Sequence, residues 1–280
     1  MQPLYLRDHF FDWGSRTYLM GIVNTTPDSF SDGGEFEHLP RALQQIETLI
    51  SGGVDIIDIG GQSTRPGAQT ITLEEELART VPLIRAVRQR FNIPLSIDTT
   101  RAVVAAAALQ AGADLINDVS GATYDPQMWA IAAQYQAPLC LMHLRGTPAT
   151  MQSLTDYDDL IGEIKVFFEQ QIRQAEQWGI TRERLILDPG LGFAKTGPQN
   201  LLLVRHLGEF KALDCPLLLG PSRKSFIGEV LQQKDPKQRI WGTAAVCCRA
   251  IAAGVDILRV HDGPEMVQVC RMADALWRGA

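Results

Sequence analysis

The sequence predicts an α/β protein built as a single (β/α)8 TIM barrel. Short apolar runs recur along the 280 residues with helical patterns between them, and strands that alternate with helices indicate parallel βαβ units. The runs are apolar almost throughout, as expected of strands that are covered on both faces. The length is near the roughly 250 residues typical of one such barrel. We therefore expect one domain over residues 1–280, with residues 1–16 as an N-terminal lead-in.

Eight apolar runs are the expected strands, at about residues 17–24, 54–60, 94–98, 114–118, 137–143, 185–188, 215–220 and 255–260. The segments between them have apolar side chains at helical spacing, N-terminal capping signals or a terminal glycine. Helices are expected over residues 39–50, 72–87, 101–111, from Asp125–Pro126 onward, and over 161–178, 200–213, 238–253 and 264–277. An open doubly wound sheet is the alternative fold, but no GxGxxG motif follows the first strand.

Charge and cysteine content narrow the possible partners. The net charge of −6 argues against nucleic acid as the main partner, because phosphate binding requires a basic surface. The five cysteines show no zinc-like spacing and are typical of small buried side chains in a reducing compartment. No apolar run approaches the roughly 18 residues of a membrane span, and no signal-peptide core is present. We expect a cytoplasmic protein with no membrane partner.

Polar residues stand at or just beyond the ends of the expected strands: Asn24, Asp98, Asn117, Asp188, Lys224, Arg259 and His261. Taken alone, each aspartate is better explained as a helix cap, each cation as a surface charge and the histidine as a structural residue. In a barrel, however, the C-terminal ends of the strands form one rim, where active sites are built. The sequence therefore predicts that these side chains converge on one pocket.

Eight short segments occur in a fixed order along the chain: NTTPDSFSDGG from Asn24, GGQSTRPG from Gly60, SIDT from Ser96, NDVSG from Asn117, LMH from Leu141, DPGLGFAKT from Asp188, GPSRKSFIG from Gly220 and RVHD from Arg259. Together they resemble the signatures of the dihydropteroate synthase family, in family order and over nearly the whole chain. One position departs from the family pattern: Gln62 stands where these enzymes usually have glutamate.

The resemblance implies condensation of (7,8-dihydropterin-6-yl)methyl diphosphate with 4-aminobenzoate to give 7,8-dihydropteroate and diphosphate. It implies a pterin diphosphate site of Thr64, Asp98, Asn117, Asp188, Lys224, Arg259 and His261. The chemistry agrees for the two aspartates and the asparagine, because a pterin ring carries paired N–H donors that carboxylates accept and an amide complements. It also implies a homodimer that sulfonamides inhibit.

The same resemblance implies a 4-aminobenzoate subsite of Phe30, Pro66, Phe193 and Ser225. Asp32, Lys224 and Arg65 are the expected catalytic residues, and Asn24 is the expected ligand of Mg²⁺, which prefers hard oxygen ligands. For the two adjacent cations, we expect Lys224 in the pocket, kept charged by Asp188, and Arg223 as a solvated charge.

Two other functions remain open from the sequence alone. One is a pterin-binding methyltransferase domain acting on methyltetrahydrofolate, which would share the barrel and the Asp98, Asn117 and Asp188 set but lack the first and seventh segments. The other is a non-catalytic barrel that binds pterin or serves as a scaffold. Release of diphosphate in the presence of both substrates distinguishes the synthase from either.

Overall fold

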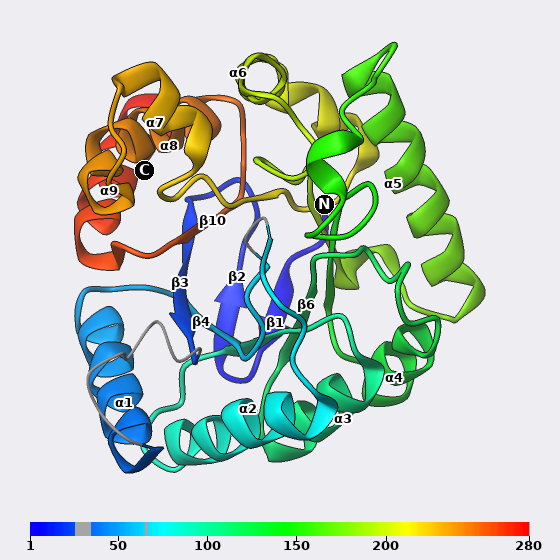
Figure 1. The fold of residues 1–280 in the computed structure, drawn as a ribbon, viewed down its shortest axis with the longest axis vertical. Coiled ribbons are helices and arrows are strands. Elements are labelled where there is room, and N and C mark those ends of the chain that lie inside the picture. The colour runs from blue at the N-terminus through cyan, green and yellow to red at the C-terminus, as the bar shows by residue number, and fades with distance from the viewer. Residues whose placement is uncertain (26–34, 65–66, 280) are drawn as a thin grey trace.

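The computed structural model of the chain describes residues 1–25, 35–64 and 67–279. Eight parallel strands form the centre and helices surround them on the outside (Figure 1). The strands pair in the order β8-β7-β6-β5-β4-β3-β10-β9, and a parallel bridge between Leu187 and Leu217 joins the two end strands. The sheet is therefore closed, which confirms the predicted TIM barrel and excludes the open sheet.

The barrel strands are β3 (Tyr18–Asn24), β4 (Ile56–Gly60), β5 (Leu95–Asp98), β6 (Leu115–Asp118), β7 (Leu139–Met142), β8 (Leu185–Asp188), β9 (Leu218–Leu219) and β10 (Ile257–Val260). The helices are α1 (Glu35–Ser51), α2 (Leu73–Arg88), α3 (Ala102–Ala111), α4 (Gln127–Tyr135), α5 (Leu160–Gln177), α6 (Gly197–Arg205), α7 (Ser225–Leu231), α8 (Ile240–Ala252) and α9 (Gly263–Trp277). Short 3-10 segments are η2 (Met151–Ser153), η3 (Arg182–Arg184), η4 (Leu207–Leu213) and η5 (Pro236–Arg239). Each expected strand is found, although β9 has only two residues, and α4 begins one residue later than expected.

Successive residues of each strand face opposite sides of the barrel wall. The outward side chains, such as Leu19, Ile57 and Leu258, pack with the helices in one large apolar core. The inward side chains near the N-terminal ends of the strands form a second apolar layer: Tyr18, Met20, Ile56, Leu115, Cys140, Ile186, Leu218 and Ile257. Two residues further along four of these strands, the inward position holds a polar residue: Asp58, Asn117, Asp188 or Arg259. The interior therefore changes from apolar to polar along the barrel axis.

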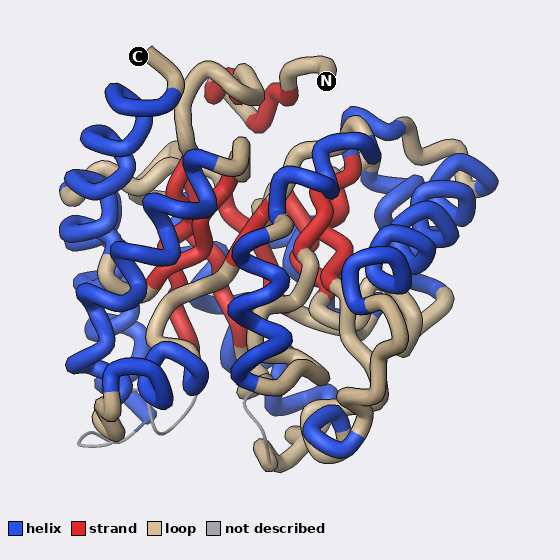
Figure 2. Tube along the Cα trace, turned by 90° about the horizontal axis from the view of Figure 1, so that it is seen from above, coloured by secondary structure: helices blue, strands red, loops and turns tan. Residues whose placement is uncertain are grey.

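The N-terminal segment closes the apolar end of the barrel. Residues 1–16 contain an antiparallel hairpin of β1 (Leu4–Leu6) and β2 (His9–Phe11), which the sequence did not reveal. Leu4, Leu6, Phe11 and Trp13 are buried against the inward apolar layer. Figure 2 shows the hairpin across one end of the strands, with both chain termini at that end.

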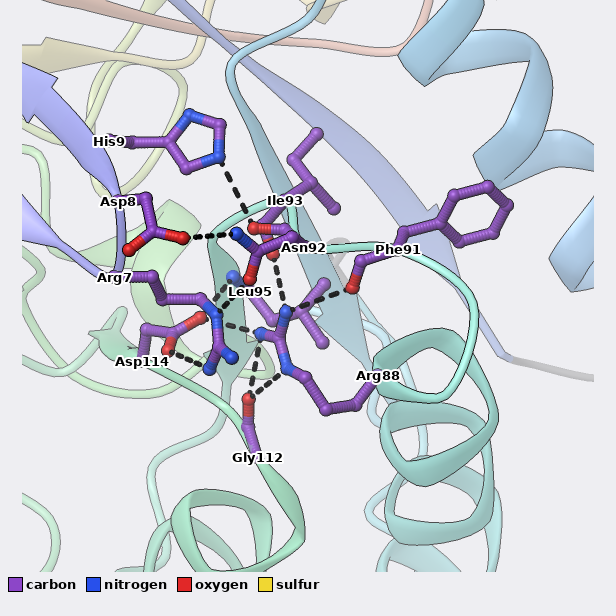
Figure 3. Close-up of polar contacts among 10 residues, drawn as sticks. All are labelled: Arg7, Asp8, His9, Arg88, Phe91, Asn92, Ile93, Leu95, Gly112 and Asp114. Atoms are coloured by element: carbon purple, nitrogen blue, oxygen red, sulfur yellow. Dashed lines mark hydrogen bonds and ion pairs between the residues drawn. The ribbon is translucent and has the colours of Figure 1, made fainter.

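A polar network fixes this hairpin to the barrel (Figure 3). Arg7 donates to the side chain of Asn92 at 2.7 Å and forms an ion pair with Asp114. Asn92 in turn donates to Asp8 at 2.8 Å, and Arg88 pairs with the same Asp114 at 2.6 Å. The network joins the hairpin, which is a separate sheet, to the loop between α2 and β5 and to the residue before β6. Of the helices described, none is long and apolar enough to cross a membrane.

Candidate active site

A cluster of buried polar side chains lies inside the barrel, directly above the apolar layer. Asp58, Asp98, Asn117 and Asp188 come from four strands, and each has 6% or less of its surface exposed. Arg259 of β10 donates to Asp58 Oδ2 at 2.6 Å and to Asp98 Oδ2 at 2.7 Å. Asn117 Nδ2 donates to the same oxygen of Asp58 at 3.2 Å. The structure thus brings together the four predicted residues of the inner strands, with Asp58 as an additional member.

The contacts of Arg259 indicate a role other than binding phosphate. Its guanidinium points at two carboxylates inside the barrel. Burial lowers its pKa, but Asp58 and Asp98 raise that pKa by more, so the group remains charged. Burial raises the pKa of Asp98 to about 7, although the positive charge of Arg259 opposes the rise. Arg259 is therefore the counter-ion that allows Asp98 to ionise near neutral pH.

Asp188 and Lys224 carry opposite charges on the wall of the site, and each affects the pKa of the other. Burial raises the pKa of Asp188, while the N–H of Gly190, which donates to Asp188 Oδ1 at 2.8 Å, and the charge of Lys224 oppose the rise. The Nζ of Lys224 lies 4.2 Å from the centre of the Phe193 ring, a cation–π contact. Phe193 packs in an apolar cluster with Val119, Met142, Leu144, Met151 and Ala194. An aromatic face, a cation and a carboxylate thus line one side of the site.

One expectation for the adjacent cations needs correction. Burial lowers the pKa of Lys224 to about 8 and Asp188 opposes the change, so the ammonium is still mostly protonated at pH 7. Arg223 is not a solvated charge, because both Nε and a terminal nitrogen bind the carboxylate of Asp262. The pocket cation is nevertheless Lys224, as expected, since Arg223 is engaged with Asp262.

The remaining described candidates lie at the ends of strands and in loops. Asn24 ends β3, is half-buried and pairs with Gly60 in the sheet. The backbone N–H of His261 donates to Ser222 Oγ at 3.2 Å, and its ring Nδ1 lies 2.9 Å from the same oxygen. Thr64 is half-buried, and Ser225 is exposed as the first residue of α7. Phe30, Asp32, Arg65 and Pro66 lie outside the described residues, so their roles stay predictions.

Sequence reasoning missed three buried residues of this region: Asp58, His143 and Lys195. A signal for Asp58 was available, because it is a charged residue within the apolar run 54–60 and two residues beyond inward-facing Ile56. His143 and Lys195 were contained in quoted motifs, but nothing in their spacing showed that the two side chains meet. Their contact, at 3.1 Å, is a product of the fold.

Gln62 has a structural role that its position in the motif did not disclose. Its Nε2 donates to the carbonyls of Ser63 and Gln69, both at 2.9 Å. Its Oε1 accepts from the N–H of Ile71 at 2.8 Å. The amide therefore joins both ends of the segment from residue 62 to residue 71. A carboxylate at this position cannot donate to the two carbonyls, so the departure from the usual glutamate changes how this loop is held.

Residues 20–261 match the family described as pterin binding enzyme. The chain belongs to the pterin-binding enzyme family. The match begins in β3 and ends at His261, so it includes each strand that contributes to the polar cluster. The Asp58, Asp98, Asn117 and Asp188 cluster is thus the inner wall of the barrel in a pterin-binding enzyme.

Similar proteins within the pterin-binding enzymes are dihydropteroate synthases. The dihydropteroate synthase of a Synechocystis strain is 63% identical over 276 residues, which are 99% of this chain and 96% of that protein. A crystal structure of the Clostridium difficile dihydropteroate synthase in the presence of pteroic acid has a TM-score of 0.91 and 46% identity, covering 96% of this chain and 99% of the other. The Yersinia pestis dihydropteroate synthase in complex with a sulfonamide drug has a TM-score of 0.93 and 43% identity, with full coverage of both chains.

Proposed function

We infer that the chain is a transferase that condenses (7,8-dihydropterin-6-yl)methyl diphosphate with 4-aminobenzoate, giving 7,8-dihydropteroate and diphosphate for folate biosynthesis. The observation that carries this inference is the relationship to dihydropteroate synthases over 99% of the chain. The buried carboxylates and amide of the inner wall supply the matching chemistry. In the reaction, the C–O bond to diphosphate breaks, a C–N bond to the arylamine forms, and the amine nitrogen loses a proton.

The pterin ring is proposed to bind at Asp98, Asn117 and Asp188. A carboxylate accepts the paired N–H donors at one edge of the ring, and Asn117 both donates and accepts. Hydrogen bonds to charged acceptors are worth about 1.5–3 kcal/mol each, and burial limits competition from water. Lys224 is proposed to donate to the ring carbonyl or a ring nitrogen from the side of Phe193. Arg259 belongs to this site as the counter-ion of Asp98.

The diphosphate is proposed to bind near Asn24, Thr64 and His261, with Mg²⁺. Among the described residues, no group of three or more His, Cys, Asp or Glu side chains is arranged to hold a metal ion. The amide oxygen of Asn24 is a hard ligand that suits Mg²⁺, which is commonly bound by few protein groups together with water and substrate phosphates. When bound, the ion would offset the charge that develops on the leaving diphosphate.

The 4-aminobenzoate is proposed to lie against Phe193, with Ser225 as a polar contact and Phe30 and Pro66 as further apolar contacts. Asp32 and Arg65 complete the proposed catalytic set with Lys224: Asp32 would stabilise the cationic pterin methylene and the incoming amine. Sulfonamides resemble 4-aminobenzoate, so we expect them to compete at this subsite.

A homodimer is proposed from an apolar surface where α7 meets α8. Val230, Leu231 and Trp241 are 61%, 49% and 78% exposed. Gly242 lies against Leu231, so the end of α7 and the start of α8 form one continuous surface. Exposed apolar patches of this kind are typical of protein interfaces.

A cytoplasmic location is proposed because all five cysteines are free, as is usual in a reducing compartment.

The deciding experiment is an assay of the purified protein with both substrates, measuring dihydropteroate and diphosphate with and without Mg²⁺. Equal amounts of both products would support the synthase. Methyl transfer from methyltetrahydrofolate without diphosphate release would instead support the methyltransferase domain. Pterin binding with neither reaction would support a non-catalytic barrel.

A further inference from the structure

Lys195 is a buried lysine for which the proposed reaction has no role. It lies in the loop between β8 and α6, and 3% of its surface is exposed. Its Nζ lies 3.1 Å from the Gly190 carbonyl, 3.0 Å from the Phe193 carbonyl and 3.1 Å from His143 Nδ1. An ammonium has three donors, so the protonated side chain can bind all three acceptors. No carboxylate among the described residues forms an ion pair with it, and burial lowers its pKa to about 7, so these three contacts are what hold the Nζ in place.

Two of these acceptors belong to the backbone that connects Asp188 to Phe193. The N–H of Phe193 donates to the Gly190 carbonyl at 3.1 Å, which closes a turn, and Lys195 binds the carbonyls at both ends of that turn. Gly190, Gly192 and Ala194 all have left-handed backbone conformations, with φ of 73°, 83° and 47°. Such a conformation is unfavourable for alanine. The loop therefore depends on contacts that hold it, and Lys195 Nζ makes two of them.

The third acceptor joins this loop to the neighbouring strand. His143 follows β7, and its backbone N–H donates to the Asp188 carbonyl at 2.9 Å. When the Lys195 side chain is protonated, its Nζ donates to His143 Nδ1, which places the ring proton on Nε2. Burial, together with the charge of Lys195, lowers the pKa of His143 to about 2, so the ring is neutral at neutral pH. The His143 ring also meets the edge of Phe167, with centroids 5.1 Å apart.

Phe193 connects this buried arrangement to the site. Lys195 binds the backbone carbonyl of Phe193, while the Phe193 ring faces Lys224. Lys195 itself is enclosed by the loop and does not line the site. We propose that Lys195 is a positioning residue, which fixes the Phe193 ring and through it the shape of the arylamine subsite. This proposal rests on the assignment of Phe193 to that subsite.

The test is a set of variants measured for two constants, the KM for 4-aminobenzoate and the dissociation constant of pterin diphosphate. Lys195→Met keeps an unbranched side chain of nearly the same length and removes the Nζ donors. We expect its KM for 4-aminobenzoate to rise at least tenfold, with pterin affinity changed less than threefold, because Asp188 is also held by its own strand. Lys195→Gln retains amide donors for the two carbonyls, so an intermediate KM is expected. Lys165→Met, a lysine on α5 away from the site, is the matched control and should change neither constant.

A double-variant cycle shows whether Lys195 acts through Phe193. Phe193→Leu should raise the KM for 4-aminobenzoate, and adding Lys195→Met to it should raise that KM no further. Independent, multiplying effects would overturn the proposal, as would an unchanged KM in Lys195→Met or, if that variant does not fold, in Lys195→Gln. A purely structural role would lower the melting temperature and the active fraction while leaving the KM unchanged. If Phe193→Leu alone has no effect on the KM, the subsite assignment is wrong, which is a different failure.

Discussion

The role of Lys224 is tested by comparing it with the adjacent cation. Lys224→Gln removes the ammonium that lies 4.2 Å from the Phe193 ring and close to Asp188, and keeps a polar side chain of similar length. Arg223→Gln removes a guanidinium that is bound by Asp262. The two residues are neighbours in the sequence, so differences between the variants report on the direction of the side chains and not on the loop that carries them.

The expected magnitude follows from the contact that Lys224 is proposed to make. Loss of one charge-assisted hydrogen bond costs about 1.5–3 kcal/mol, which weakens pterin diphosphate binding by about 10- to 150-fold at 1.4 kcal/mol per tenfold change. Turnover should fall with it. Arg223→Gln breaks a partly exposed ion pair, which lowers the unfolding free energy by about 1 kcal/mol. Its loss of pterin affinity should be below about threefold, as for changes away from a site.

Calorimetric titration with pterin diphosphate at pH 7, together with initial rates, measures both effects. At pH 7 the wild-type ammonium is largely protonated, because its pKa is about 8. As the pH rises through 8 the charge is lost, so wild-type affinity should decline toward that of Lys224→Gln, which itself should not follow this decline. If Arg223→Gln loses more pterin affinity than Lys224→Gln, the pocket cation has been assigned to the wrong residue.

Four further predictions concern other parts of the molecule. Because Asp98 has a pKa of about 7, pterin affinity should fall as the pH drops through 7, and Asp98→Asn should remove that dependence; a wild-type affinity that is constant from pH 8 to 5.5 would contradict this. Asn24→Ala should raise the Mg²⁺ concentration needed for half-maximal turnover more than it changes pterin affinity, and an unchanged Mg²⁺ dependence would make Asn24 only a turn residue. Gln62→Glu should speed hydrogen exchange at residues 67–71, since two carbonyls lose their donor at about 1 kcal/mol each; equal exchange would show that the amide does not hold the loop. Trp241→Ser should shift sedimentation toward a monomer, whereas an unchanged dimer, or a wild-type monomer, would exclude this surface as the interface.

Much of the barrel was predictable because its strands are buried on both faces and read as apolar runs between helical patterns. The inner site was predictable because Asp98, Asn117 and Asp188 end such runs, and the ends of parallel strands meet at one rim. The hairpin at residues 4–11 was not predicted, because strands of three residues are too short to show a two-residue period.

Contacts between segments that are distant in the sequence were also not predicted from it. The partners of Arg259 depend on register, since Asp58 and Asp98 lie on strands that are far from residue 259 in the sequence. The lowered pKa of Lys224 depends on burial, and the sequence only indicated that a carboxylate was near. A motif identifies which residues converge, but packing decides which of them remain charged.

The hairpin at the N-terminal end also constrains the order of events in catalysis. Leu4, Leu6, Phe11 and Trp13 are buried at that end of the barrel, so we expect ligands to exchange through the opposite end. The proposed pterin contacts Asp98 and Asn117 lie on barrel strands, whereas the proposed arylamine contact Phe193 lies in the loop after β8, so we propose that the arylamine binds over the pterin. Binding should therefore be sequential, with the pterin diphosphate entering first, and 4-aminobenzoate that arrives early would obstruct it. Dihydropteroate spans both depths, so it must leave as one piece before the next pterin can enter.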